Sequence, residues 1–236
     1  MPKAIFFDLD STIITWPVPY DVVWETLCRK YASEVEGLET ATLLEAINQV
    51  RSWYWSDPER FRQGRLNLVA TRRKIVRLAF SNLKLGNIEL ADKIADAYSA
   101  EREETASLVP QAIQTLKQLR NSGLKLALIT NGGSDLQRPK IEKFRLEPYF
   151  DNILIEGEFG CGKPDERVFL HTLEKLNVTA ADAWMVGDDL EFDIAPCRPL
   201  GIYSLWVDEG GKGLPAKDGA HPDRVIRSIG EIPGLL

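Results

Sequence analysis

The chain has 236 residues, 44% of them hydrophobic and 27% charged, and its formal net charge is -6 at pH 7. This composition is typical of a globular protein with a sizeable core, and the negative charge argues against general nucleic-acid binding, which favours basic faces. No apolar run approaches the roughly 20 residues that span a bilayer, so we expect no membrane partner. No signal-like leader precedes the first strand, and the three widely spaced cysteines predict no disulfide framework. We therefore expect a cytoplasmic protein.

The first predicted element is a buried strand, Ala4–Phe7, and two carboxylates follow it directly. A short apolar run of this kind is typical of a parallel sheet that is covered on both faces. Asp8 and Asp10 then stand at the carboxyl end of the strand, where open α/β sheets bind their ligands. Buried carboxylates need partners or a cation, and with a metal present one could act as a nucleophile and the other as a proton donor.

The segment 14–107 interrupts the strand pattern. Its helical patterns lie at 22–31, 42–50, 66–80 and 88–98, and it contains no convincing strand. We predict a helical domain over 14–107, inserted into a sheet domain made of residues 1–13 and 108–236. Because the insert leaves the sheet beside Asp8, we expect it to lie over that strand end as a lid.

Four later apolar segments are predicted as buried strands, at 124–130, 153–155, 183–186 and Tyr203–Val207. Helical patterns separate them, and this alternation predicts right-handed crossovers and a parallel sheet. The expected fold class is therefore α/β, a Rossmann-like parallel sheet with helices on both faces. The segment 210–222 is predicted as a loop, and its sequence indicates no role.

Polar residues follow two of these segments where a phosphate site would need them. Thr130 and Asn131 end the second strand and precede two glycines, so a hydroxyl and exposed main-chain N–H groups can bind phosphate oxygens. Lys163 stands before a predicted helix and could offset the charge of carboxylates and phosphate. Taken singly, the first pattern is also that of an ordinary turn, and the second that of a solvated loop lysine.

An acidic cluster follows the strand 183–186. Magnesium takes hard oxygen ligands in octahedral array, commonly one or two carboxylates with waters and substrate phosphate, and Asp8 with Asp188 would meet that need. Asp193 would be a second ligand or a partner for Lys163. A solvated, helix-capping turn is the ordinary alternative for a lone acidic cluster.

In combination these patterns resemble the haloacid dehalogenase (HAD) superfamily. Its four motifs are matched in order by Asp8-x-Asp10-x-Thr12, Thr130-Asn131, Lys163-Pro164, and Gly187-Asp188 followed by Asp193. The resemblance covers the predicted sheet domain from end to end and implies that the helical insert is a C1 cap. Enzymes of this branch are mostly small-molecule phosphatases.

The resemblance implies that the protein hydrolyses a small-molecule phosphate monoester with Mg²⁺ as cofactor. Asp8 would attack phosphorus to form an aspartyl phosphate, and Asp10 would protonate the leaving alkoxide and later activate water. The implied metal ligands are Asp8, the main-chain carbonyl of Asp10, and Asp188. The implied phosphate-binding groups are Thr130, main-chain amides near Asn131, and Lys163. Thr12 and Asp193 are candidate supporting residues.

Several alternatives stay open at this point. A haloacid dehalogenase is disfavoured because halide needs no proton to leave, and family members with that activity lack the second aspartate of the first motif. A phosphomutase shares all four motifs, and a phosphoacceptor module also uses strand-end aspartates. Sugar phosphate, nucleotide, phosphoglycolate and acylneuraminate phosphate are all candidate substrates, and the chain could be a monomer or a homodimer.

The segment 51–84 carries nine basic residues against two acidic ones, Asp57 and Glu59. A basic lid would steer anionic substrates, although charge runs are more often solvated helix faces. The candidate substrate contacts in and near this segment are Trp16, Trp55, Arg65 and Arg72. Packing is the ordinary alternative for each of them.

Overall fold

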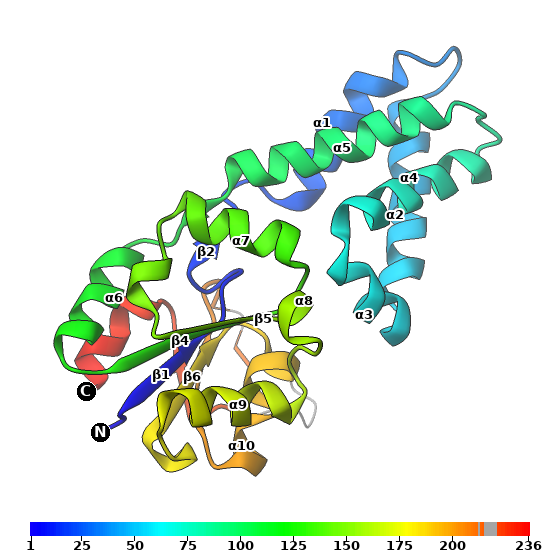
Figure 1. Cartoon of the computed structure of the whole chain (residues 1–236). Coiled ribbons are helices and arrows are strands. Elements are labelled where there is room, and N and C mark those ends of the chain that lie inside the picture. Colours follow the sequence, from blue (N-terminus) through cyan, green and yellow to red (C-terminus); the bar gives the residue numbers. More distant parts are fainter. Residues whose placement is uncertain (212, 215–220) are drawn as a thin grey trace. The chain divides into compact units, whose positions relative to one another are not determined.

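A computed structural model of the chain describes residues 1–211, 213–214 and 221–236. Part of the predicted loop 210–222, namely residues 212 and 215–220, lies outside the described residues. The chain divides into two compact units, Met1–Thr15 with Ser107–Leu236, and Trp16–Ala106 (Figure 1). Each unit is described by itself.

The first unit is built on a six-stranded sheet with the order β5-β4-β1-β6-β7-β8, and every pairing in it is parallel. Its strands are β1 Ala4–Phe7, β4 Lys125–Thr130, β5 Asn152–Ile155, β6 Ala183–Gly187, β7 Tyr203–Val207 and β8 Arg224–Ile226. The predicted parallel α/β fold is confirmed. β8 was not predicted, because only Ile226 of its three residues is buried and so its sequence shows no apolar run.

The position of β1 in the sheet determines where the first two aspartates lie. All four residues of β1 are buried, and Phe7 stands in register with Leu128 of β4 on one side and Val186 of β6 on the other. Asp8 therefore leaves the sheet from an inner strand, at the edge where all neighbouring strands end.

Helices cover both faces of the sheet, as the strand–helix alternation predicts. They are α6 Ala112–Asn121, α7 Ser134–Lys143, α8 Glu156–Phe159, α9 Glu166–Leu176 and α10 Cys197–Leu200. Side chains alternate along a strand, so Ala4 and Phe6 share one face and pack in a buried cluster with Phe169 and Leu173 of α9. In Figure 1, α6 and α7 lie on the side of the sheet opposite α9 and α10. From β1 the chain moves through β4 to β5 in one direction along the sheet, and from β5 it returns to β6 and β7 in the other direction. Right-handed crossovers that run in opposite directions place their helices on opposite faces of the sheet.

Short elements complete the first unit. Four of them are single-turn or irregular helices, η1 Glu147–Tyr149, η2 Ala180–Asp182, η3 Leu190–Ile194 and η4 Ile229–Leu235. The strands β2 Ile14–Thr15 and β3 Ser107–Leu108 pair antiparallel at the point where the chain leaves the unit and returns to it. These two strands were not predicted, because two residues are too few to show a period.

The second unit is a bundle of five α-helices, α1 Tyr20–Ala32, α2 Thr40–Trp55, α3 Pro58–Leu66, α4 Leu68–Asn82 and α5 Ile88–Thr105. The helix predicted over 66–80 begins later, because the chain breaks at Asn67, whose side chain accepts a hydrogen bond from the N–H of Ala70. Sequence periodicity missed α3, since only Gly64 of its nine residues is buried. No helix in the described part of the chain is both long and apolar enough to cross a bilayer.

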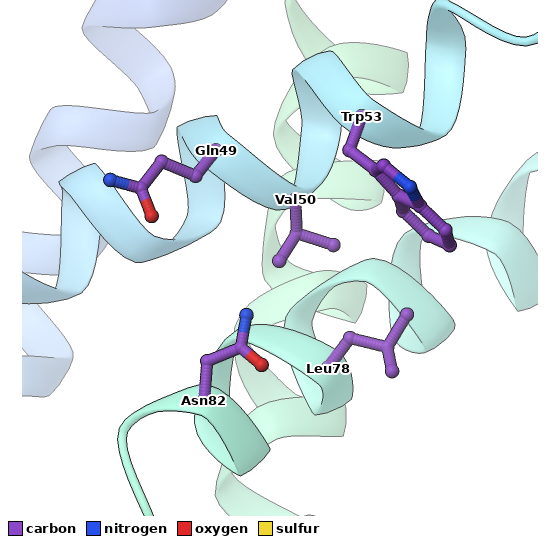
Figure 2. A pocket seen from close by; sticks show the side chains of 5 residues that line it. All are labelled: Gln49, Val50, Trp53, Leu78 and Asn82. Atoms are coloured by element: carbon purple, nitrogen blue, oxygen red, sulfur yellow. The ribbon is translucent and has the colours of Figure 1, made fainter.

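The bundle has its own core and one surface pocket of note. The core includes Trp24 of α1, whose ring stacks on Tyr98 of α5 at 4.0 Å between centroids and 11° between planes. A pocket of about 260 Å³ lies between α2 and α4, and Figure 2 shows the side chains that line it, Gln49, Val50, Trp53, Leu78 and Asn82. The guanidinium of Arg60 lies 4.0 Å from the centre of the Trp53 ring, so a cation–aromatic contact holds the ring that lines this pocket.

Candidate active site

Three carboxylates and one lysine meet at the carboxyl edge of the sheet. Asp8 follows β1, Asp188 follows β6, and Asp193 lies in η3; one oxygen of each lies within 4.8 Å of the others. The ammonium of Lys163 donates to Oδ1 of Asp8 and to Oδ1 of Asp193, both at 2.6 Å. Lys163 is only 2% exposed, so this ion-pair cluster is shielded from water.

The charges in this cluster do not balance. Burial raises the pKa of Asp8 and of Asp193, and it raises the pKa of Asp188 to about 7, while the Lys163 ammonium acts in the opposite direction on all three. Burial also disfavours the charged form of Lys163, but the carboxylates of Asp193 and Asp8 outweigh it and raise the lysine's pKa. One cation thus faces three carboxylates in a poorly solvated place, and a further positive charge would stabilise the ionised cluster.

The donor set fits a hard divalent cation. Each of three carboxylates can offer one oxygen, and these three oxygens lie within 4.8 Å of one another. Such a set suits Mg²⁺, which prefers oxygen ligands and retains some of its waters. The gathered carboxylates are Asp8, Asp188 and Asp193, whereas the Asp10 carboxylate hydrogen-bonds to residues of α7 instead. A metal contact by Asp10 would therefore use its main-chain carbonyl, as the resemblance implies.

A tight turn after β6 places Asp193. Oδ1 of Asp189 caps η3 by accepting the N–H groups of Glu191 and Phe192 at 2.8 and 2.9 Å, and the Asp189 N–H donates to Oδ2 of Asp193 at 3.0 Å. A Cβ added at Gly187 would overlap the Asp193 carboxyl group. Glycine is therefore required at position 187, because the Asp193 side chain occupies the space of a larger residue.

A second polar segment follows β4 and supports the lysine. The Asn131 side chain donates from Nδ2 to the Lys163 carbonyl and accepts at Oδ1 from the Lys163 N–H, both at 2.8 Å. The N–H of Gly132 donates to Oε2 of buried Glu156 at 2.8 Å. These bonds hold the loop after β4 against the Lys163 segment. The amide side chain of Asn131 is thereby engaged, and Thr130 lies buried beside it.

Asp10 lies beside α7 and has partners that sequence reasoning did not identify. Lys140 Nζ donates to Oδ1 and Oδ2 of Asp10 at 2.9 and 2.8 Å, and Gln137 Nε2 donates to Oδ2 at 3.1 Å. Thr12, two residues further, has its hydroxyl 3.5 Å from Oδ1 of Asp188. The structure thus brings the residues of all four motifs to one edge of the sheet.

Comparison with known proteins identifies the family. A sequence model of haloacid dehalogenase-like hydrolases matches residues 2–201. The chain is a haloacid dehalogenase-like hydrolase. It is 32% identical to a phosphoserine phosphatase of Thermus thermophilus over 98% of this chain and 97% of that protein, and 29% identical to a ribulose-1,5-bisphosphate 5-phosphatase of Halopiger xanaduensis over the whole of both. Among solved structures, a 2-haloacid dehalogenase of Pseudomonas syringae aligns with a TM-score of 0.67 and 27% identity, covering 100% of this chain and 98% of that one.

Three residues that contact the candidate site were missed at the sequence level, Gln137, Lys140 and Glu156. A signal for the first two exists, because positions three apart on a helix share a face and this helix begins at Ser134, soon after Thr130. The same pattern occurs on many solvated helices, so spacing alone does not single it out. No sequence pattern indicates Glu156, because its burial depends on the close approach of Gly162. A Cβ added at Gly162 would lie 2.6 Å from Cδ of Glu156.

The candidate substrate contacts of the helical insert all lie in the second unit, where each has a neighbour in that unit. The Trp16 indole donates to the Arg102 carbonyl at 2.7 Å, and Trp55 packs edge-on against Tyr54 and Phe61. Arg65 lies 5.5 Å from the centre of the Phe61 ring, and Arg72 donates to the Ser99 hydroxyl at 3.1 Å and lies over the Tyr98 ring. These contacts fit the packing alternative and leave a role in substrate binding to experiment.

Proposed function

We propose that this hydrolase is a magnesium-dependent phosphatase that cleaves a small-molecule phosphate monoester through an aspartyl phosphate on Asp8. The observation that carries the proposal is the cluster of Asp8, Asp188, Asp193 and Lys163, with Asp10 two residues from the nucleophile. It combines a fixed carboxylate nucleophile, a set of oxygen donors for a cation and a separate carboxyl group for proton transfer.

In the first step an oxygen of Asp8 attacks phosphorus and the bond from phosphorus to the leaving oxygen breaks. The leaving oxygen takes a proton from Asp10, so the alcohol departs neutral. Water then attacks the phosphorus of the aspartyl phosphate, gives a proton to Asp10, and releases phosphate while Asp8 is regenerated. Lys163 holds Oδ1 of Asp8 during this sequence and fixes the direction of attack.

Asp8 and Asp188 would hold the magnesium ion with the main-chain carbonyl of Asp10, and Asp193 would support the site through Lys163. When bound, the ion supplies positive charge that offsets the carboxylates and the phosphate. Thr130 accepts a hydrogen bond from Gln137 at 2.9 Å, and its own hydroxyl donates to the Asn131 carbonyl over 3.4 Å. That long bond is weak, so the hydroxyl proton could turn to a phosphoryl oxygen when substrate binds. Because the Asn131 side chain bonds to Lys163, the phosphate contact proposed for Asn131 uses its main-chain N–H.

The relatives support the reaction class and leave the substrate open. Phosphoserine phosphatase and ribulose-1,5-bisphosphate 5-phosphatase are named for different phosphate monoesters, so similarity at this level does not select one. We propose that the second unit is the C1 cap and that Trp16, Trp55, Arg65 and Arg72 are the residues to test for substrate selection. Dehalogenation is the second candidate, since a 2-haloacid dehalogenase shares the fold, and Asp10 argues against it because halide leaves without a proton.

The test is release of phosphate from p-nitrophenyl phosphate, with Mg²⁺ and with EDTA. We expect turnover only with the metal, and a loss of at least about a thousandfold in Asp8→Asn. Asp182→Asn is the matched control, because Asp182 precedes β6 at the opposite edge of the same sheet. Chloride release from 2-chloropropionate should be undetectable. A folded wild-type protein that releases no phosphate, or an active Asp8→Asn variant, would overturn the proposal.

A further inference from the structure

Two side chains of α7 hold the Asp10 carboxylate. Lys140 bonds both oxygens of Asp10, at 2.9 and 2.8 Å, and the side chain of Lys140 is only 15% exposed. Gln137, three residues earlier on the helix, bonds Oδ2 at 3.1 Å. Charge-assisted bonds of this length to both oxygens fix the rotation of a carboxylate, and partial burial protects them from competition by water.

The same Gln137 amide reaches the loop proposed to bind phosphate. Its Nε2 lies 2.9 Å from the Thr130 hydroxyl and 2.6 Å from the Asn131 carbonyl, and the side chain is 3% exposed. An amide nitrogen carries two hydrogens, so it can serve only two of its three acceptors at a time. The Asp10 contact can therefore weaken during the reaction while both hydrogens of the amide stay bonded.

We propose that Lys140 and Gln137 are positioning residues for proton transfer by Asp10, an inference that rests on the phosphatase function proposed above. Gln137 fixes the distance between the acid and the phosphate loop, because one buried amide touches both. Lys140 supplies charge: when Asp10 gives its proton to the leaving oxygen, the ammonium stabilises the carboxylate that forms. The same carboxylate then accepts a proton from the attacking water.

This role predicts a dependence on the leaving group. p-Nitrophenolate departs as a stable anion and needs little protonation, whereas phenolate is more basic and needs the acid. In Lys140→Met, kcat/KM for phenyl phosphate should therefore fall by about a hundredfold, within the usual range for general acid–base catalysis, and kcat/KM for p-nitrophenyl phosphate by less than about fivefold. kcat/KM is the right quantity, because it covers the steps up to departure of the leaving group and excludes hydrolysis of the intermediate.

Companion variants separate positioning from folding. Lys140→Arg keeps the charge and should recover most of the phenyl phosphate activity. Gln137→Met should lower activity on both substrates, because its amide also holds the phosphate loop, with a further loss on phenyl phosphate. Lys143→Met, on the same helix, is the matched control and should match wild type on both substrates. Thermal melting with Mg²⁺ present checks that each variant is folded.

The outcomes distinguish this inference from the function on which it rests. Equal losses on the two aryl phosphates in Lys140→Met, or no loss on either, would overturn the positioning role while leaving the phosphatase function in place. A wild-type protein inactive on both substrates would overturn the function instead.

Discussion

Asn131 uses both ends of its side-chain amide to hold the main chain of Lys163, and this makes a residue of one motif the support of another. The two bonds, each 2.8 Å long, join the loop after β4 to the segment before α9. Lys163 itself has to reach Asp8 and Asp193 at once, so a small displacement of its main chain would break one of the two ion pairs. The position of the buried ammonium therefore depends on an uncharged neighbour.

Replacement of this amide provides a test at the level of one residue. Asn131→Ala removes both bonds, each of which contributes about 0.5–1.5 kcal/mol, so the free energy of unfolding should fall by about 1–3 kcal/mol. The kcat/KM for p-nitrophenyl phosphate should fall at least about tenfold, because Lys163 loses its support. Urea unfolding and steady-state kinetics measure the two effects.

Asn121→Ala, at the exposed end of α6, is a control for loss of an asparagine far from the site. A variant at Asn131 with wild-type kinetics and lowered stability would show that the loop is structural and does not position the lysine for catalysis.

Residues that stand directly at strand ends could be predicted from the strand pattern alone, whereas Lys163 and Asp193 were predicted only in combination with them. Asp8, Thr130 and Asp188 follow apolar runs, and parallel strands bring such positions to one edge whatever lies between them. Lys140 and Gln137 were missed because their role depends on which face of α7 points to the sheet edge. That orientation is a property of packing and leaves only a spacing of three residues in the sequence.

At the scale of elements, periodicity predicted the well-buried helices and strands and failed on the poorly buried ones. Strand β1 is buried at every position and was predicted with its observed limits, whereas β8 buries one residue and α3 buries only Gly64. A hydrophobic pattern exists only where an element has a buried face. Elements held mainly by neighbours, caps or polar contacts therefore escape sequence analysis.

The stack of Trp24 on Tyr98 tests how the bundle of the second unit is held together. Trp24→Ala should lower the free energy of unfolding by about 3–5 kcal/mol, the usual cost of emptying a large aromatic site. Trp24→Phe should cost much less, because the ring stack is kept and the indole N–H, for which the described residues offer no hydrogen-bond partner, is removed.

Urea unfolding followed by circular dichroism measures both changes. Trp53→Ala serves as the control for loss of an indole, since Trp53 is 52% exposed and its removal should leave stability nearly unchanged. If the phenylalanine variant were as unstable as the alanine variant, the stack would not be the stabilising contact.

At the scale of the whole molecule, the carboxylate cluster links stability to pH and to metal. Burial raises the pKa of Asp188 from 3.8 to about 7, and it raises the pKa of Asp8 and Asp193 in the same direction. Between about pH 4 and 7 the metal-free native state therefore binds more protons than the unfolded chain. Stability then falls as pH rises through this window, which is opposite in sign to the effect of ordinary salt-bridged aspartates. Lys163 stays protonated in both states over this range and adds no slope of its own.

A thermal shift series at pH 5 and pH 8, with and without Mg²⁺, tests this linkage. The metal-free melting temperature should be lower at pH 8 than at pH 5. At pH 8 and a hundred times its dissociation constant, Mg²⁺ should raise the free energy of unfolding by about 2.7 kcal/mol, which is roughly 5–10 °C in melting temperature for a chain of this size. At pH 5 the increase should be much smaller, because protons compete with Mg²⁺ for the carboxylates. Sodium chloride at equal ionic strength controls for screening, and Asp188→Asn should lose most of the Mg²⁺ response at pH 8. An equal Mg²⁺ shift at the two pH values would mean that the ion does not bind at the buried carboxylates, because binding there has to displace the protons that burial favours.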